Sequence, residues 1–399
     1  MDAASRDCSF DQSDVDPETL SLAKYQSLAA ATDSTKETHT GVQLLLLGLF
    51  GEVGSLMSEL KKKQRDAESY AGYEKSVVEE LGDVLWYFSN IASRSGLSLV
   101  EIAPSSECKE IDSDCKFRDL QPSLAKTSPK TPEHYGDALM KLAGNVGALS
   151  KAFAAASPDN FSADLRASLP NIFCSLVEVA NDSDVRIADA AFCNIGKIFD
   201  RWPSKKVYPR LFDERYESDE QLPRIFEMVI YERVVGDKSY VFQKCNGIFV
   251  GDRLTDNKLE QDDYRFHDVF HLAYVAKLGW SPVIRRLLKL KRKSNPLVDE
   301  NEDGARAALV EEGISTWVFN HAETLNFYSG LQVVDYNMLK SVKELASGYE
   351  VESCPLWLWE EAILSGFEMF RNLKRHRKGI ISVDMNERTI TFDPMSDGL

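Results

Sequence analysis

The chain has 399 residues, a formal net charge of −16 and a pI near 5.0. Its length predicts two or three domains with ample material for a core, and its acidity argues against general binding to the nucleic-acid backbone. Neither the polar start at Met1–Asp7 nor the short apolar run Val42–Phe50 has the length and apolar character of a signal peptide or a membrane span. The seven scattered cysteines form no CxxC pair. We therefore expect a cytoplasmic protein with free thiols, no membrane partner and no stable nucleic-acid binding.

The first half of the chain carries helical patterns. Residues 1–20 are polar, and helices are predicted over about 20–32, 41–64, 73–94 and 186–201. Thr38–Thr40 can cap the second of these helices, and Lys61–Lys63 suit its C-terminal end. One apolar stripe on the third helix predicts its buried face: Val77, Leu81, Val84, Phe88 and Ile91.

A weak internal repeat follows a segment, residues 104–134, that is rich in Ser, Pro, Asp and Lys and is predicted to be a flexible linker. Gly144–Leu149 parallels Gly51–Leu56, and Leu169–Phe173 parallels Leu81–Leu85. The acids do not return, because Glu52, Glu59 and Asp83 become Asn145, Ala152 and Asn171. We interpret residues 20–205 as one helical domain, with a first copy at about 38–104 and a degenerate second copy at about 135–203. A shared preference in helix packing is the alternative.

The second half of the chain changes character after Pro209 and the polar run 213–221. Strands are predicted near 224–250, around Gly236–Asp237, and a hairpin is predicted at 379–392. Helical patterns fill the sequence between them, from about Asp262 to Arg377. The predicted fold is thus mainly α: a helical bundle, then a second α-rich domain at 206–399 with a small antiparallel β-sheet.

Acidic residues recur at helical spacing on two predicted helices. Glu52, Ser55 and Glu59 share one stripe, and another stripe carries Glu80, Asp83, Tyr87 and Asn90. Carboxylates in such apolar helices repel one another unless a cation neutralises them, and Mg²⁺ prefers oxygen ligands. The glycines beside them, at 51, 54 and 82, indicate close helix packing or room for a ligand. The alternative is that these are ordinary solvated helix faces.

These residues resemble the MazG-type nucleoside triphosphate pyrophosphohydrolases. Gly48–Gly54 followed by Glu79–Tyr87 is similar to the family's pattern of ExxE, a spacer and ExxD on two helices of an all-α NTP-pyrophosphatase bundle. Glu80 and Asp83 match ExxD, and Glu52 matches the first acid of ExxE. Ser55 stands where the second acid belongs, so Glu59, one turn further on, is expected to replace it. Residues 194–201 fit the family's Asn-x-x-Lys-x-x-x-Arg segment, although they follow the degenerate copy. The C-terminal half is similar to the extension of some MazG-like proteins.

The resemblance implies Mg²⁺-dependent hydrolysis of an NTP or dNTP to the nucleoside monophosphate and pyrophosphate. It implies Glu52, Glu80 and Asp83 as catalytic residues, and these three with Glu59 as ligands of Mg²⁺, with Mn²⁺ as a substitute. A further set is expected to contact the substrate: Lys61, Lys62, Asn90, Asn194 and Lys197. Because members of this family often dimerise, the resemblance also implies a homodimer or higher homo-oligomer. Two alternatives stay open: a catalytically weak nucleotide-binding sensor or regulatory protein, and a helical scaffold.

A second constellation lies in the C-terminal half. His267 and His271 share a helix face at a spacing able to grip a metal, with Asp268 beside them and Glu312 on a later helix. Three interpretations compete. These residues could belong to a further diverged copy of the bundle, to an independent metal or phosphate site, or to a structural polar network in a helical core.

Overall fold

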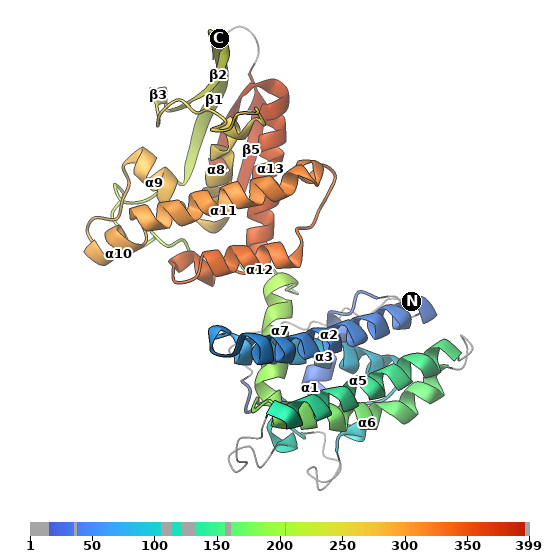
Figure 1. Cartoon of the computed structure of the whole chain (residues 1–399). Helices are drawn as coiled ribbons and strands as arrows, with labels where there is room; N and C mark the ends of the chain where they lie inside the picture. The colour runs from blue at the N-terminus through green and yellow to red at the C-terminus, as the bar shows by residue number, and fades with distance from the viewer. Residues whose placement is uncertain are drawn as a thin grey trace, which may run out of the picture. The chain divides into compact units, whose positions relative to one another are not determined.

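A computed structural model describes residues 16–35, 38–104, 114–121, 132–155, 161–203 and 205–395 of the chain. The chain divides into two compact units, residues 1–205 and 206–399. Each unit has its own hydrophobic core. The described part of the first unit is helical and the second combines helices with one sheet (Figure 1). The predicted mainly α fold with a small antiparallel sheet is confirmed.

The first unit is a bundle built on two helical pairs. Helix α2 (His39–Asp66) packs against α3 (Tyr73–Arg94), and α5 (Pro132–Ala155) packs against α6 (Phe161–Asp182). Helix α2 also contacts α5, while α1 (Leu22–Ala31) and α7 (Ile187–Arg201) pack on α3. A short α4 (Leu99–Ile102) and two 3₁₀ turns, η2 (Ala67–Ser69) and η3 (Phe117–Leu120), complete the described elements. This packing brings α2, α3 and α7 together.

Local sequence explains why α2 and α3 form where they do. The Thr38 side chain caps α2 by accepting a hydrogen bond from the Gly41 amide, and Lys63 and Arg65 complement the dipole at its end. On α3 the five residues of the predicted apolar stripe are all buried. Burial of such a stripe is what holds an amphipathic helix in place, because isolated helices are only marginally stable in water.

Helix α2 and the turn after it, His39–Ser69, are long and apolar enough to cross a membrane by length and composition alone, with a mean hydropathy of 1.4 over the most apolar window. A core helix of a bundle passes the same test. The buried side chains of α2 pack with the core of the first unit, and Glu52 and Glu59 interrupt its apolar character. Of the most apolar window, 39% is buried inside the structure.

Two expectations for the first unit need correction. Part of the segment 104–134, predicted as a flexible linker, is packed: Phe117 and Leu120 are buried, because apolar side chains gain by leaving water, and Lys116 bridges to Ser21. Residues 105–113 and 122–131 of that segment, like residues 1–15, lie outside the described residues. Cys174, Cys193, Cys245 and Cys354 are not disulfide-bonded, but Cys115 is, so the prediction that the thiols are reduced fails there.

The second unit is built around a five-stranded antiparallel sheet in the order β3-β2-β1-β4-β5. Its strands are β1 (Ile225–Val235), β2 (Lys238–Cys245), β3 (Ile248–Phe249), β4 (Lys378–Asp384) and β5 (Thr389–Pro394). A two-residue turn joins β1 to β2, and Gly236 adopts the positive φ of +68° that such a turn requires. The two predicted hairpins therefore form one sheet, through the pairing of β1 with β4.

Helices pack on this sheet and on one another. Helix α8 (Asp268–Leu278) contacts β4, β5 and, most extensively, α13 (Leu356–His376). The remaining helices are α9 (Pro282–Leu288), α10 (Pro296–Asn301), α11 (Ala305–Glu323) and α12 (Tyr336–Leu345), with the 3₁₀ turns η5 (Tyr264–Phe266), η6 (Asn326–Tyr328) and η7 (Glu350–Ser353). Helix α11 contacts α8 and α9. An arrangement of helices on a sheet is not a further copy of the bundle, so that interpretation of the second constellation is wrong.

Candidate functional sites

Three carboxylates converge between α2 and α3. Oxygens of Glu52, Glu80 and Asp83 all lie within 4.8 Å of one another, and each residue is half-buried. Because Glu80 and Asp83 are three residues apart on α3, one turn of helix directs both at α2, where Glu52 meets them. The structure thus brings together the three acids that the sequence analysis selected.

The charges in this cluster are poorly compensated. Burial and the neighbouring charges of Glu52 and Asp83 raise the pKa of Glu80 from 4.5 to about 7. Burial, followed by the charge of Asp83, also raises the pKa of Glu52, and burial raises that of Asp83 although Lys197 opposes it. Raised carboxyl pKa values of this kind mark a place where a cation would lower the energy of the ionised state.

Helix α7 supplies the polar partners of the cluster. Asn194 donates to Asp83 Oδ1 at 2.9 Å and accepts a hydrogen bond from the Tyr25 hydroxyl at 3.1 Å. Lys197 pairs with Asp83 and lies 3.4 Å from Glu79 Oε1. The close approach depends on Gly82, since a Cβ atom there would lie 2.6 Å from the Ala190 carbonyl oxygen. Two predicted substrate-binding residues are therefore at the cluster, and Glu79 is a neighbouring acid that the sequence analysis did not select.

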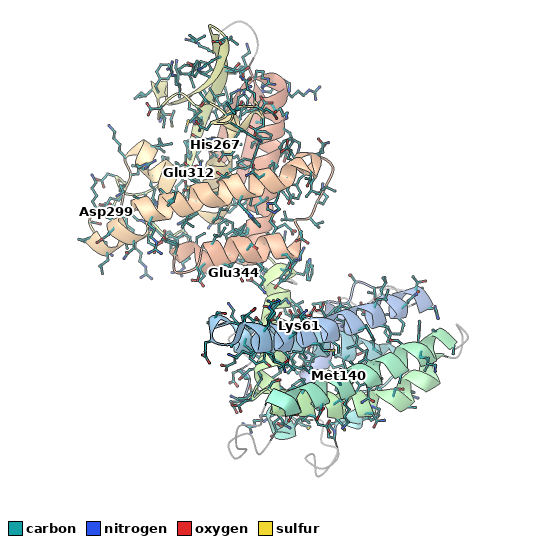
Figure 2. The ribbon with its side chains drawn as sticks, in the orientation of Figure 1. Lys61, Met140, His267, Asp299, Glu312 and Glu344 are labelled. Carbon is teal, nitrogen blue, oxygen red and sulfur yellow. The ribbon has the colours of Figure 1, made fainter. Side chains whose placement is uncertain are left out.

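The remaining predicted residues of the first unit lie elsewhere. Glu59 is buried, and its carboxylate accepts from the Tyr70 hydroxyl and pairs with Lys62. Asn90 is buried and donates to the backbone carbonyl of Trp86 at 3.0 Å. Lys61 is exposed on α2 (Figure 2). The structure does not bring these side chains into the three-acid cluster.

A cavity of about 650 Å³ lies in the first unit. Aromatic side chains of α3 and of the end of α7 line it: Trp86, Tyr87 and Trp202, together with Leu44 and Thr32 among others. Burial and then the charges of Glu52 and Asp83 raise the pKa of Tyr87, so this cavity-lining residue lies close enough to the acids to feel their charge. Gly48 has no side chain to block the Tyr87 ring. The sequence analysis missed this cavity, because its walls come from segments far apart in the chain.

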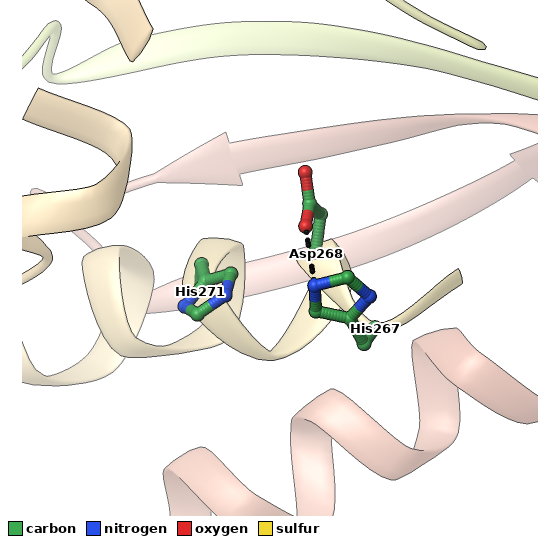
Figure 3. A group of neighbouring side chains, drawn as sticks. All are labelled: His267, Asp268 and His271. Atoms are coloured by element: carbon green, nitrogen blue, oxygen red, sulfur yellow. Dashed lines mark ion pairs between the residues drawn. The ribbon is translucent and has the colours of Figure 1, made fainter. Parts of the chain in front are cut away.

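The second unit holds a separate cluster of two histidines and an aspartate at the start of α8. His267, Asp268 and His271 are buried and offer ligand atoms within 4.8 Å of one another (Figure 3). His267 Nε2 lies 3.1 Å from Asp268 Oδ1, and Glu312 Oε2 on α11 lies 3.7 Å from His267 Nε2 and 3.4 Å from His271 Nε2. All four predicted second-site candidates are therefore neighbours.

Each member of this cluster has a partner that contacts the side-chain atom not directed at the other members. His267 Nδ1 lies 2.9 Å from the Tyr264 carbonyl oxygen, and its ring stacks on the Tyr264 ring with centroids 4.3 Å apart. His271 Nδ1 lies 2.8 Å from Glu311 Oε1, and Gln243 of β2 donates to Asp268 Oδ2. Burial lowers the pKa of His271, but Glu311 and Glu312 raise it more, to well above its usual value. Glu311 and Gln243 were missed; a glutamate facing inward from the apolar α11 was the available signal for Glu311.

Comparison with known proteins identifies the second unit. Residues 207–396 match the family model of the MazG C-terminal domain. This match, over slightly less than half of the chain, confirms the predicted resemblance to MazG-like proteins with a C-terminal extension. The match indicates a role like that of the nucleotide pyrophosphohydrolases. The searches found no matching curated protein and no matching solved structure.

Proposed function

We propose that the first unit hydrolyses a nucleoside triphosphate, an NTP or a dNTP, to the monophosphate and pyrophosphate with the help of Mg²⁺. The observation that carries this proposal is the meeting of Glu52, Glu80 and Asp83 within 4.8 Å, with the pKa of Glu80 raised to about 7. An all-oxygen donor set with excess negative charge fits Mg²⁺, and Mn²⁺ as a substitute. Bound there, the ion would neutralise phosphate charge and polarise the attacked phosphorus.

The residues around the acids have complementary roles in this proposal. Lys197 lies beside Asp83 and Glu79. Once a metal neutralises these acids, the Lys197 ammonium group can pair with a substrate phosphate instead. Asn194, bonded to both Tyr25 and Asp83, holds that carboxylate in place. A carboxylate of the cluster that is not bound to metal can accept a proton from the attacking water.

The aromatic cavity supports a nucleotide as the substrate. Its rings at Trp86, Tyr87 and Trp202 offer flat faces on which a nucleobase can stack. Tyr87 joins the cavity to the acids, so a base in the cavity would direct its phosphates toward the cluster. We propose that the base binds here.

One observation favours the rival function of a nucleotide sensor. Ser55 replaces the second acid of the ExxE pattern, and Glu59 is engaged by Tyr70 and Lys62. Three carboxylates rather than four would then hold the metal, and turnover would be slow. The sensor would bind nucleotide in the same cavity without hydrolysing it.

The test is an assay of pyrophosphate release from a panel of NTPs and dNTPs with Mg²⁺. We expect release by the wild type and a loss of roughly 100-fold or more in Asp83→Asn, because a metal ligand is removed. Asn171→Ala changes the corresponding position of the second helical pair and serves as the matched control with unchanged activity. Nucleotide binding without any pyrophosphate release by the wild type would establish the sensor instead. If the protein bound neither metal nor nucleotide, the remaining interpretation would be a helical scaffold.

We also propose that a second copy of the chain covers an exposed apolar face of the first unit. Leu47 and Phe50 on α2 and Met140 on α5 are each more than half exposed, and α2 packs directly against α5 (Figure 2). Large apolar side chains gathered on neighbouring helices favour association. Sedimentation should show a dimer or higher oligomer, and Leu47→Glu should shift it to monomer. A monomeric wild type would refute the proposal.

A further inference from the structure

We propose that the second unit contains a transition-metal site, formed by His267, Asp268, His271 and Glu312, that is independent of the acidic cluster in the first unit. The metal is a divalent ion of the Zn²⁺, Mn²⁺ or Fe²⁺ class, since imidazole nitrogens select such ions over Mg²⁺. Three kinds of observation support this site: the hydrogen-bond partners of the imidazoles, the distances between the ligand atoms and the burial of the histidines.

The partners of the two imidazoles determine which nitrogens carry hydrogen. The Tyr264 carbonyl oxygen can only accept, so His267 Nδ1 must donate to it. The carboxylate of Glu311 also accepts hydrogen bonds from Ser281 Oγ at 2.6 Å and from the Val283 amide at 2.9 Å, so it acts as the acceptor in its contacts. His271 Nδ1 therefore donates to Glu311 as well. In the neutral tautomers, both Nε2 atoms are left as bare acceptors.

Both Nε2 atoms face carboxylate oxygens. Asp268 Oδ1 lies 3.1 Å from His267 Nε2, and Glu312 Oε2 lies 3.4 Å from His271 Nε2. His271 is fully buried, and its Nε2 makes no hydrogen bond within the described structure. Two imidazole nitrogens and two carboxylate oxygens that face one another form a donor set able to bind a divalent cation.

The separations fit a metal ion. Ligand bonds of about 2.0–2.2 Å in a tetrahedral site place neighbouring donor atoms roughly 3.4 Å apart. Three of the separations among His267, Asp268, His271 and Glu312 are 3.1, 3.4 and 3.7 Å, and the ligand atoms of the first three residues all lie within 4.8 Å of one another. Gln243 binds Asp268 Oδ2 and leaves Oδ1 directed at the cluster. The ligand atoms are therefore already arranged around a space of the right size.

The surroundings provide the support that metal-binding histidines need. Glu311 orients His271 as the carboxylate of a carboxylate–histidine–metal arrangement, and the Tyr264 carbonyl does the same for His267. Glu312 is the most exposed ligand, at 37% of its side chain, so solvent reaches the site from its side. We assign Glu311 as a positioning residue and the other four as ligands.

The experiment measures Co²⁺ and Zn²⁺ binding by the full chain in an Asp83→Asn background, which disables the acidic site. We expect one Co²⁺ per chain, with visible absorption bands typical of imidazole ligation, displaced by Zn²⁺ and not by a large excess of Mg²⁺. Glu312→Gln, at the exposed edge, should weaken binding and change the absorption bands. Glu311→Gln should lower affinity roughly 10- to 100-fold, as loss of a supporting carboxylate does.

His321→Ala is the matched control, because His321 is exposed on α11 away from the cluster, and it should bind metal as the wild type does. Unfolding temperatures of all variants, measured without metal, identify any that fail to fold. A folded chain that binds no Co²⁺ or Zn²⁺, or binding that Glu312→Gln and Glu311→Gln leave unchanged, would overturn the proposal. The cluster would then be a structural polar network.

Discussion

Replacing Glu80 by glutamine should stabilise the metal-free protein at alkaline pH. The pKa of this carboxyl is raised from 4.5 to about 7, chiefly by burial and then by the charge of Glu52. At about 1.4 kcal/mol per pKa unit, ionised Glu80 costs the folded state roughly 3.4 kcal/mol. Because Glu80 is partly exposed, solvent screening reduces this to roughly 1.5–2 kcal/mol. Glutamine removes the charge and still donates to Glu52.

The pH dependence follows from the sign of this shift. Because the folded state binds the Glu80 proton more tightly than the unfolded state, ionisation favours unfolding. The cost is absent below pH 4.5, grows between pH 4.5 and 7, and is complete above pH 7. The gain from Glu80→Gln should therefore be small at pH 4.5 and largest above pH 7.

Thermal unfolding in EDTA at pH 4.5 and 8.5 measures the effect. A gain of 1.5–2 kcal/mol should raise the unfolding temperature of the first unit by roughly 5 °C at pH 8.5. Mg²⁺ should then stabilise the wild type more than the variant. Glu74→Gln, at an exposed position on the same helix, is the matched control and should give no pH-dependent gain. Equal or lower stability of Glu80→Gln at pH 8.5 would show that the acids do not repel one another as described.

Three further predictions concern the same unit. Gly82→Ala should lower the free energy of unfolding by about 1–3 kcal/mol, because the new Cβ would meet the α7 backbone. Gly54→Ala, which has open space around it, should raise the free energy of unfolding by up to about 1 kcal/mol. Chemical denaturation measures both, and equal effects of the two substitutions would contradict the packing argument. Glu59→Gln should keep Mg²⁺ affinity, measured by calorimetry, within about threefold of the wild type, because the Glu59 carboxylate is already bound by Tyr70 and Lys62. A fall in affinity as large as that caused by Asp83→Asn would instead show that Glu59 is a metal ligand. Trp202→Ala should raise KM for nucleotide roughly tenfold with little change in kcat, because a stacking surface is lost. An unchanged KM would contradict the proposal that the base binds in the cavity.

The sequence by itself determined much of the helical framework. Periodicity predicted α3 and its buried stripe, because one apolar face per helix must leave water. Turn chemistry at Gly236 predicted the first hairpin, because a two-residue turn needs positive φ. Helical spacing also placed Glu80 and Asp83 on one face, and His267 and His271 on another. These are local properties, and they depend only on near neighbours in the chain.

Tertiary structure decided what each of these side chains meets. Glu52 and Glu59 look equivalent on one helical stripe, yet packing sets Glu52 against α3 and Glu59 against Tyr70 and Lys62. Glu311 and Glu312 are adjacent in sequence, yet one is fully buried behind His271 and the other reaches solvent. Charge compensation, burial and unpaired atoms arise from contacts between distant segments. No spacing rule contains that information, because it is fixed only when the helices pack.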